Sequence, residues 1–452
     1  MIDTQLLSLD LRAQLDLVQI KKISPAELAQ QQLALVERVN PALNAFLCYE
    51  PSVFNEQRNV APLRNISIAV KDNIDVLGFA STAGMLTRQG RMPTEDAFVI
   101  QKLRNAGGVI SGKLNMDEGG LGKTNHNINF GNCHNPHRIG FTPGGASGGS
   151  ASAVSACMTA LAIGTDTMGS VRIPASYCGV FGLKPSPGMV SNRGSLRCSP
   201  GMDSIGPLAR SARDVELALG AMCGFDLLDS QSINYQTKGY LQLPDLPVLL
   251  VPEDLSLLIS DDSIIADFKH NIQVFIDIGC QVKMVDLSHY DFAAGRRAEL
   301  LLCEAQMRAE HQYDWQQSPE KFSAPLRALL GGVDNKSPVE YILAEQVFRN
   351  AVISARKLFT TGSYLLMPTT GQRAFSFDAE VPQGQADLCC FADQAGLTAL
   401  SLPMISESEL PAGMQLIGQA GSDFAILKLA QAWQYASGYH FQMPGVIQAL
   451  CE

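Results

Sequence analysis

The sequence predicts an α/β layer fold, and three successive segments carry this prediction. The β-branched run Ile66–Val70 is typical of a buried strand. After Thr94, apolar residues recur at helical spacing, and Val109–Ser111 is again typical of a strand. A strand, a helix and a strand in this order form the repeating unit of layered α/β proteins.

Capping and breaking residues set the ends of the predicted helices. Ser24–Glu27 has serine at the N-cap, proline at the first helical position and glutamate at the capping-box position. The stop signal of this helix lies near Asn40–Pro41. Thr94 is the predicted N-cap of the second helix, which ends at Gly107–Gly108 ahead of the next strand.

The second half of the chain is less informative. From about 250 to 360 the sequence is polar and helical in pattern, with no residues that indicate chemistry. The tail from Leu365 to Trp433 alternates apolar runs with turns and closes with a helix from Asp423. Because the sequence has no internal repeat and no low-complexity linker, we expect one domain over residues 1–452.

Composition narrows the class of protein. The chain has 452 residues, of which 46% are apolar, and a formal net charge of −10. It contains no run of five or more basic residues. This argues against direct nucleic-acid binding and against an anionic membrane surface as a partner.

The start of the chain and the cysteines indicate a compartment. Acidic residues stand where a secretory signal has its basic region, and no uninterrupted apolar run is long enough to span a membrane. The eleven cysteines are scattered without a Cys-x-x-Cys motif, which is typical of reduced, buried thiols. We therefore expect a cytoplasmic protein without membrane association.

Three segments are candidates for chemistry: the lysine after the predicted strand, Lys71, the glycine-rich loop Gly140–Gly149, and a second loop, Gly164–Ser170. Each segment alone has an ordinary structural explanation. A lysine after a strand is usually a solvated surface charge, and loops of small residues are more often tight turns than active sites. The combination of the three is more specific than any one of them.

In combination the segments resemble the amidase signature family, and the matching motifs are spread from Ala69 to Gly418. The resemblance implies an amidase signature fold, a large mixed β-sheet flanked by helices on both faces. It places a signature core at about 60–212, a variable helical region at about 250–360, and closing strands and a helix at about 365–440. The matching motifs are Ala69–Asn73, Asn115–Glu118, Pro143–Ser150, Gly164–Pro174, Cys178–Pro185 and Leu410–Gly418.

The resemblance implies an amidohydrolase that cleaves a linear amide through an acyl-enzyme, using a Ser-cis-Ser-Lys triad. Ser170 corresponds to the nucleophile and Lys71 to the base that activates it. A lysine is a base only when neutral, and burial after an apolar strand favours the neutral form. We therefore expect Lys71 to be buried against hydroxyl groups, close to Ser147 or Ser170. Neither a cofactor nor a metal is implied.

The middle member of the triad departs from the family. In the family's Gly-Gly-Ser-Ser-Gly-Gly loop, the serine after a cis peptide carries the proton between the lysine and the nucleophile. Ala146 stands at that position here, with Ser147 beside it. Either Ser147 or a water substitutes for that serine, or the chain is an engineered inactive variant or a natural pseudo-enzyme. We still expect the Gly145–Ala146 peptide to be cis, because glycines set the geometry of this loop.

The same resemblance assigns the remaining site residues. Backbone N–H groups from Thr167 to Gly169 would form the oxyanion hole. Met168 stands where many relatives have glycine, so it should narrow the pocket. Arg172 either holds a substrate carboxylate or braces the loop, and its place two residues after the nucleophile favours bracing. The predicted oxyanion and binding group comprises Gly144, Gly145, Asp166, Thr167, Met168, Gly169 and Arg172.

Two further motifs are weaker. Gly145–Gly149 also fits the Gly-x-Ser-x-Gly elbow of α/β-hydrolases, but that elbow needs a strand immediately before it and Gly140–Gly144 precedes it here. His134 and His137 lie close together in the sequence, yet a metal site would need further ligands at fixed spacing.

Three functions stay open at this point. The first is a stand-alone amidohydrolase whose partner is a small-molecule amide. The second is the A subunit of the tRNA-dependent glutamyl amidotransferase, which works in a complex and passes ammonia to a partner subunit. The third is an amide-binding protein that lost turnover through Ala146. The sequence is compatible both with a homo-oligomer and with a complex that contains a partner subunit.

Overall fold

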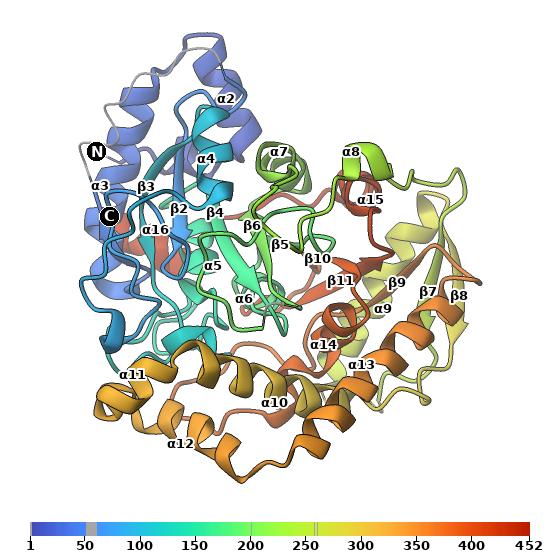
Figure 1. Ribbon diagram of the computed structural model, residues 1–452. Helices are drawn as coiled ribbons and strands as arrows, with labels where there is room; N and C mark the ends of the chain where they lie inside the picture. Colours follow the sequence, from blue (N-terminus) through green and yellow to red (C-terminus); the bar gives the residue numbers. More distant parts are fainter. Residues whose placement is uncertain (1, 51–60, 200, 257, 260) are drawn as a thin grey trace.

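One mixed sheet of eleven strands runs through the computed structural model, which describes residues 2–50, 61–199, 201–256, 258–259 and 261–452 (Figure 1). The order of strands is β1-β3-β2-β4-β6-β5-β10-β11-β9-β7-β8. The predicted α/β class and mixed sheet are therefore confirmed. The strands are β1 (Phe46–Tyr49), β2 (Ser67–Lys71), β3 (Val109–Leu114), β4 (Leu161–Asp166), β5 (Phe181–Lys184), β6 (Ser204–Ala209), β7 (Val248–Pro252), β8 (Gln281–Val285), β9 (Tyr364–Pro368), β10 (Thr398–Pro403) and β11 (Gly413–Gly418).

The sheet contains two parallel parts joined by antiparallel strands. β2 is parallel to both of its neighbours, β3 and β4, and β7 is parallel to both β8 and β9. The pairs between these parts, from β4–β6 to β11–β9, are antiparallel. Because neighbouring parallel strands end at the same edge of a sheet, β2 and β4 can bring two catalytic segments together.

Helices cover both faces of the sheet, as predicted. In Figure 1, α4, α7 and α15 lie above the central strands, and α5 and α6 lie below them. The upper helices contact β3, β6 and β10, and the lower ones contact β4 and β10. The apolar residues between these layers form the main core. The bounds are α4 (Phe98–Asn105), α5 (Gly148–Ser155), α6 (Arg172–Cys178), α7 (Ala212–Met222) and α15 (Asp423–Ser437).

A separate group of helices borders the site. Helices α10, α12 and α13 run along the lower side of the molecule in Figure 1, and α10 and α13 pack against α14. Helix α10 supplies one wall of the pocket described below. The bounds are α10 (Phe292–Glu310), α12 (Ala324–Gly332), α13 (Pro338–Leu358) and α14 (Asp387–Gln394). The other helices are α1 (Thr4–Ser8), α2 (Leu11–Gln19), α8 (Tyr235–Lys238), α11 (Gln312–Gln317) and α16 (Gly445–Cys451).

The region expected to be helical, about 250–360, also holds part of the sheet. Strand β7, helix α9 (Asp262–Asp277) and strand β8 form a parallel strand-helix-strand unit that extends the sheet beyond β9. Neither strand was predicted from the sequence. The physical reason is clearest for β8, which forms the sheet edge and has Val285 as its one buried residue, so its sequence lacks the apolar alternation of a covered strand.

One predicted helix has the right start and the wrong end. The capping box is present in α3 (Pro25–Leu43), where Ser24 Oγ accepts from the N–H of Glu27 at 3.1 Å. The predicted stop near Asn40–Pro41 is wrong, because the helix continues through Pro41 and ends at Asn44 with φ 51°. Pro41 lies in the last turn, where its missing N–H costs only one helical bond.

The predicted N-cap of α4 is also wrong. The helix begins at Phe98, and Ala97 holds the N-cap position without a side-chain hydrogen bond. Thr94 lies in a bend before it. The predicted end is correct, since Gly107 adopts φ 87° between α4 and β3, a conformation that suits glycine.

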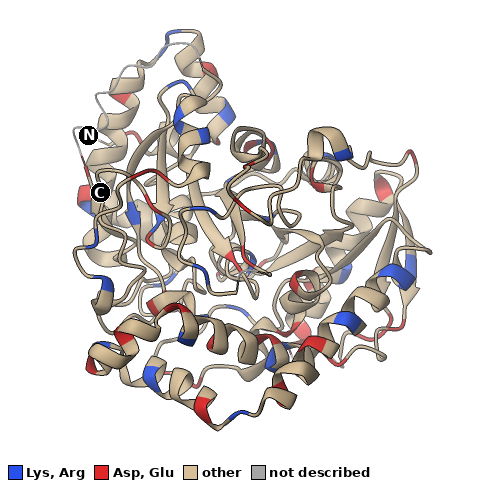
Figure 2. Ribbon diagram, viewed as in Figure 1, with Lys and Arg blue, Asp and Glu red and all other residues tan. Residues whose placement is uncertain are grey.

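Two further features of the described residues are the apolar length of the helices and the distribution of charge. No described helix is long and apolar enough to cross a bilayer. Figure 2 shows acidic and basic residues interspersed over the outer helices, without a continuous basic stretch along the ribbon in this view.

Candidate active site

The parallel strands β2 and β4 bring the two predicted catalytic segments together. They pair with Ile68 opposite Leu161 and Val70 opposite Ile163. The chain leaves β2 at Lys71 and leaves β4 into the loop that reaches Ser170. Lys71 and Ser170 consequently line the same small cavity, of about 10 Å³.

Lys71 is buried, with 1% of its surface exposed. Its ammonium donates to Thr165 Oγ1 at 2.7 Å and lies 3.4 Å from the Thr165 carbonyl oxygen. Burial lowers the pKa of Lys71 to about 8, although the carboxylates of Asp117 and Asp166 act in the opposite direction. The expected hydroxyl partner is therefore present, but it belongs to Thr165, which the sequence analysis did not single out.

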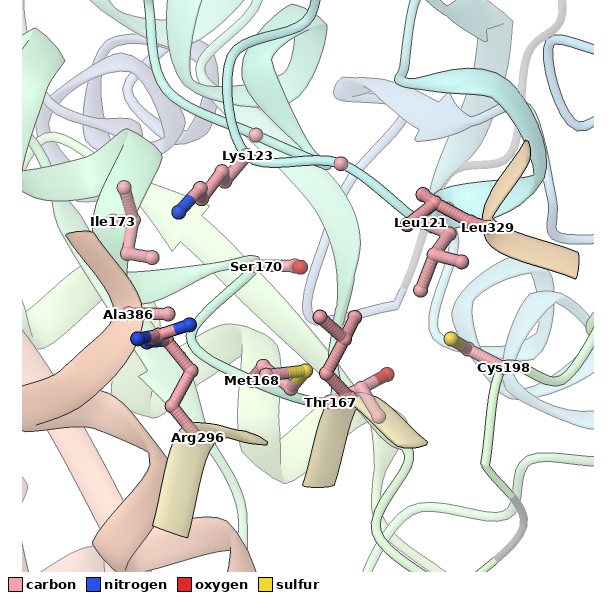
Figure 3. Close-up of a pocket in the computed structure, with 14 residues that line it drawn as sticks. Leu121, Lys123, Thr167, Met168, Ser170, Ile173, Cys198, Arg296, Leu329 and Ala386 are labelled. Carbon is pink, nitrogen blue, oxygen red and sulfur yellow. The ribbon is translucent and has the colours of Figure 1, made fainter. Parts of the chain in front are cut away.

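Ser170 faces a second and larger pocket, of about 250 Å³. Figure 3 shows Ser170 in the middle of this pocket, with the labelled side chains arranged around it. Met168, which is expected to narrow the pocket, is one of the lining residues. The walls are mostly apolar, and their larger side chains are Leu121, Met168, Ile173, Leu300 and Leu329.

The loop before Ser170 is organised by the carboxylate of Asp166. This carboxylate accepts from the N–H of Gly169 at 2.7 Å and from the N–H of Val171 at 3.1 Å. The N–H of Gly169 is thus already hydrogen-bonded and is not available for the predicted oxyanion hole. The N–H groups of Thr167, Met168 and Ser170 have no acceptor among the described residues, so they are the donors left for a substrate oxygen.

Arg172 is fully buried and uses all of its side-chain donors within the protein. Its guanidinium donates to both oxygens of Asp166, at 3.0 Å each, and to Asp393 at 2.6 Å. The remaining donors reach the Cys389 carbonyl oxygen at 3.0 Å and Gln415 Oε1 at 3.1 Å. No donor of Arg172 is left and none of its surface is exposed, so its contacts favour the bracing alternative over substrate binding.

Residues 145–147 pass beside Ser170. The Gly145–Ala146 peptide is cis, as expected. The N–H of Ser147 donates to the Ser170 carbonyl oxygen at 3.1 Å, and its hydroxyl donates to the Thr165 carbonyl oxygen at 3.0 Å. The same hydroxyl accepts from the N–H of Thr165 at 3.3 Å. The hydroxyl of Ser147 is therefore engaged with the backbone of β4.

Close packing explains why residues 144 and 145 are glycines. Gly144 has φ 80° and lies against Pro174. A Cβ added at Gly145 would come within 2.0 Å of Asp117 Oδ2 and within 2.7 Å of the backbone nitrogen of Thr124, so a side chain has no room there.

Two carboxyl groups that the sequence analysis assigned no role also border the site. Asp117 is buried and accepts from the N–H of Asn125 at 3.0 Å, and burial raises its pKa to about 6. Asp203 accepts from Thr167 Oγ1 at 2.6 Å, and burial raises its pKa to about 6 as well. Asp117 lies inside a family motif, which was an available signal. Asp203 reaches the site only because β6 runs antiparallel to β4.

The two neighbouring histidines have structural contacts. His134 Nδ1 accepts from the N–H of Gly140 at 3.1 Å, and His137 Nε2 lies 3.1 Å from the Cys178 carbonyl oxygen. Within the part of the chain that the structure describes, no group of three or more metal-ligand side chains is present.

Comparison with known proteins places this site in a family. A family model described as Amidase matches residues 26–427. The chain belongs to the amidase family. Its relatives include the A subunit of glutamyl-tRNA(Gln) amidotransferase from Thermus thermophilus, which is 33% identical over 459 residues, covering 94% of this chain and 96% of the relative.

Solved structures agree with this membership. The A subunit of glutamyl-tRNA(Gln) amidotransferase from Thermotoga maritima superposes with a TM-score of 0.85 at 27% identity, covering 99% of each chain. An inhibitor-bound structure, described as a vestigial protein complex that reveals the origins of an s-triazine catabolic enzyme, gives a TM-score of 0.87 at 25% identity. That alignment covers 96% of this chain and 100% of the other. This amidase-family chain is therefore an enzyme of the class that acts on amide bonds.

Proposed function

We propose that the chain hydrolyses a linear carbon–nitrogen amide bond through an acyl-enzyme formed on Ser170, with neutral Lys71 as the base. One observation carries this proposal. Ser170 faces a pocket on one side and, on the other, shares a small cavity with a buried lysine whose pKa is lowered to about 8. A serine hydroxyl needs such a base, and a lysine serves as one only when burial lets it lose its proton.

The proposed reaction has two halves. Ser170 Oγ attacks the amide carbonyl carbon while its proton passes to Lys71, and the N–H groups of Thr167, Met168 and Ser170 hold the resulting oxyanion. The carbon–nitrogen bond then breaks as the nitrogen receives the proton. A water, deprotonated by the same base, attacks the acyl carbon and releases the acid with Ser170 restored.

The proton must travel between Ser170 and Lys71 without a hydroxyl at residue 146. The structure supports a route through Thr165 and one water, because Thr165 Oγ1 holds the lysine and lines their shared cavity. Asn73 Oδ1 and Asn192 Oδ1 are buried acceptors without a partner, and both asparagines line this cavity. A space of about 10 Å³ with such acceptors suits one water. Ser147 is the weaker substitute, because its hydroxyl already bonds to β4.

The test is ammonia release from a panel of primary amides by the unsubstituted chain, Ala146→Ser and Ala146→Ser/Ser170→Ala. We expect Ala146→Ser to be about 10²–10⁴-fold faster than the unsubstituted chain, because it restores a positioned proton-transfer group. The double variant should be inactive. Ala151→Ser is the matched control, since Ala151 is also buried but lies on α5 away from both pockets, and it should leave the rate unchanged.

Two outcomes contradict parts of the proposal. Equal and substantial rates for the unsubstituted chain and Ala146→Ser would show that a water or Ser147 is sufficient and that residue 146 has no relay role. Failure of Ala146→Ser on every amide would contradict the hydrolase itself and favour an amide-binding protein without turnover.

A second candidate is the A subunit of a glutamyl-tRNA(Gln) amidotransferase. It is favoured by the identity of 33% with a relative of that name, over nearly the full length of both chains. This function requires a partner subunit that receives ammonia. Co-purification from the native source decides it: a stoichiometric partner supports the amidotransferase, and a chain that purifies alone and releases ammonia supports the stand-alone hydrolase.

Compartment and domain organisation belong to the same proposal. All eleven cysteines lie in the described part of the chain and none forms a disulfide, which supports a reducing compartment such as the cytoplasm. One sheet that unites strands from β1 to β11 supports a single domain over residues 1–452.

A further inference from the structure

The two ends of the pocket in front of Ser170 differ in charge. Lys123 and Arg296 are its only charged lining residues in the described part of the chain, and no carboxylate lines it. In Figure 3 their nitrogen atoms lie on one side of Ser170, and Leu121 and Leu329 lie on the other side. The wall of an otherwise apolar pocket thus carries two cations at one end.

Lys123 is a partly buried cation whose direct partners are uncharged. Its ammonium donates to the carbonyl oxygens of Pro382 and Gln383, at 3.1 and 3.0 Å. Burial lowers the pKa of Lys123, and the nearby guanidinium of Arg296 lowers it further. Two carbonyl oxygens fix the direction of the ammonium without neutralising it, and one of its three protons stays available.

Arg296 extends from α10, and a carboxylate contacts its guanidinium group at one edge only. Its Nε donates to Asp387 Oδ1 at 2.5 Å, and this is its one hydrogen bond within the described residues. Both Nη groups are therefore left as donors. Asp387 is the one carboxylate that acts on both cations, so two positive charges face a single negative charge.

From this arrangement we propose that Lys123 and Arg296 bind a carboxylate group of the substrate. The inference rests on the proposed amide hydrolysis and specifies the substrate class: an amide that carries a carboxylate on a short apolar stem. The two Nη groups of Arg296 form a planar fork that suits a carboxylate, and Lys123 adds a point charge. A bound carboxylate would balance the charges at this end of the pocket.

Arg172 does not compete for this role, because all of its donors are used inside the protein. The apolar side chains around Ser170 would contact the stem of the substrate. Monoamides of short dicarboxylic acids have this composition, with an amide for Ser170 at one end and a carboxylate at the other.

Matched ligands test the proposal on the unsubstituted chain. Succinamate and succinamide differ only in that a neutral amide replaces the carboxylate, and glutaramate and glutaramide form a second such pair. We expect calorimetry to give about 10- to 100-fold tighter binding for the carboxylate member of the better-fitting pair, as hydrogen bonds to charged groups provide. Equal affinities within both pairs would overturn the proposal.

Variants assign the preference to the two cations. Lys123→Met and Arg296→Met should each reduce the ratio of carboxylate to neutral affinity about 10-fold, whereas Arg297→Met should leave it unchanged. Arg297 is the matched control because it is the next residue on α10 but is exposed and outside the pocket. Each ratio is measured within one variant, so a change in folding affects both ligands alike. An unchanged ratio in Lys123→Met and Arg296→Met would also overturn the proposal.

Turnover by Ala146→Ser separates this inference from the proposed function. Hydrolysis of both members of a pair at the same kcat/KM would refute the carboxylate site and leave the hydrolase intact. Binding preference without hydrolysis of any amide would refute the hydrolase and leave the carboxylate site intact.

Discussion

Strands β2 and β3 run side by side, and each carries one fully buried lysine near its carboxyl end, in contrasting surroundings. Lys113 lies opposite Val70, one residue before Lys71 in the register. The ammonium of Lys113 donates to the Ile74 carbonyl oxygen at 2.7 Å and to Ser81 Oγ at 2.8 Å, and it lies 3.4 Å from the carboxylate of Asp72. This lysine holds together the turn that follows β2.

Lys71 has far fewer partners. It bonds to Thr165 alone, and it forms no ion pair among the described residues. Burial lowers the pKa of both lysines, and the carboxylate of Asp72, which pairs directly with Lys113, acts in the opposite direction at that lysine. Residue type and burial are the same at the two positions, so the partners decide which lysine is structural and which can act as a base.

The largest expected effect separates the two lysines by function. Lys71→Met should reduce turnover about 10²–10⁴-fold, because the general base is lost. Lys113→Met should instead lower the free energy of unfolding by about 3–5 kcal/mol, because it leaves Asp72 as an unpaired buried charge. Ammonia release and denaturant unfolding of both variants, measured in the Ala146→Ser chain, check this prediction.

The contrast between the variants provides its own control. Loss of stability without loss of turnover in Lys71→Met would mean that this lysine is structural like Lys113. Turnover that falls in Lys113→Met in proportion to the unfolded fraction would agree with the prediction.

The second prediction concerns pH. The active form of Lys71 is neutral, so kcat/KM should rise about tenfold per pH unit below pH 8 and level off above it, which gives about a 100-fold difference between pH 6 and the plateau. A pH profile from 6 to 10 measures the midpoint. A rate that is flat over this range, or that falls as the pH rises through 8, would exclude Lys71 as the base.

The third prediction concerns the single partner of Lys71. Thr165→Val removes the hydroxyl that receives its hydrogen bond, so we expect about a tenfold lower kcat from the loss of positioning. Thr165→Ser keeps a hydroxyl and should restore most of the rate. Equal loss in both variants would show that keeping the hydroxyl does not keep the rate, and it would remove Thr165 from the proton route.

The smallest expected effect concerns the carboxylates near Lys71. Asp117 is the first carboxylate that raises the pKa of Lys71, and Asp203 acts in the same direction more weakly. Asp117→Asn should therefore move the midpoint of the pH profile to lower pH. One pKa unit corresponds to about 1.4 kcal/mol, and a shift of about one unit or less should increase the rate at pH 7 a few-fold. Asp203→Asn should shift the midpoint less. A midpoint that moves upward in Asp117→Asn would contradict the assignment.

Local patterns in the sequence determined much of this protein. The β-branched run before Lys71 predicts a strand, and Ser24–Glu27 predicts the start of α3, because these signals depend on hydrogen bonds and periodicity within a few residues. The motif around Ser170 predicts the loop after β4. The edge strand β8 lacks such a local signal and was missed.

Only the tertiary structure decided which groups meet. Thr165 receives the bond of Lys71 because two parallel strands end at one sheet edge, and Arg172 is braced because Asp393 reaches it from α14. Lys123 and Arg296 face one pocket from a loop and from a helix far apart in the chain. Such contacts are set by the packing of whole elements against one another, so no pattern within either segment carries them.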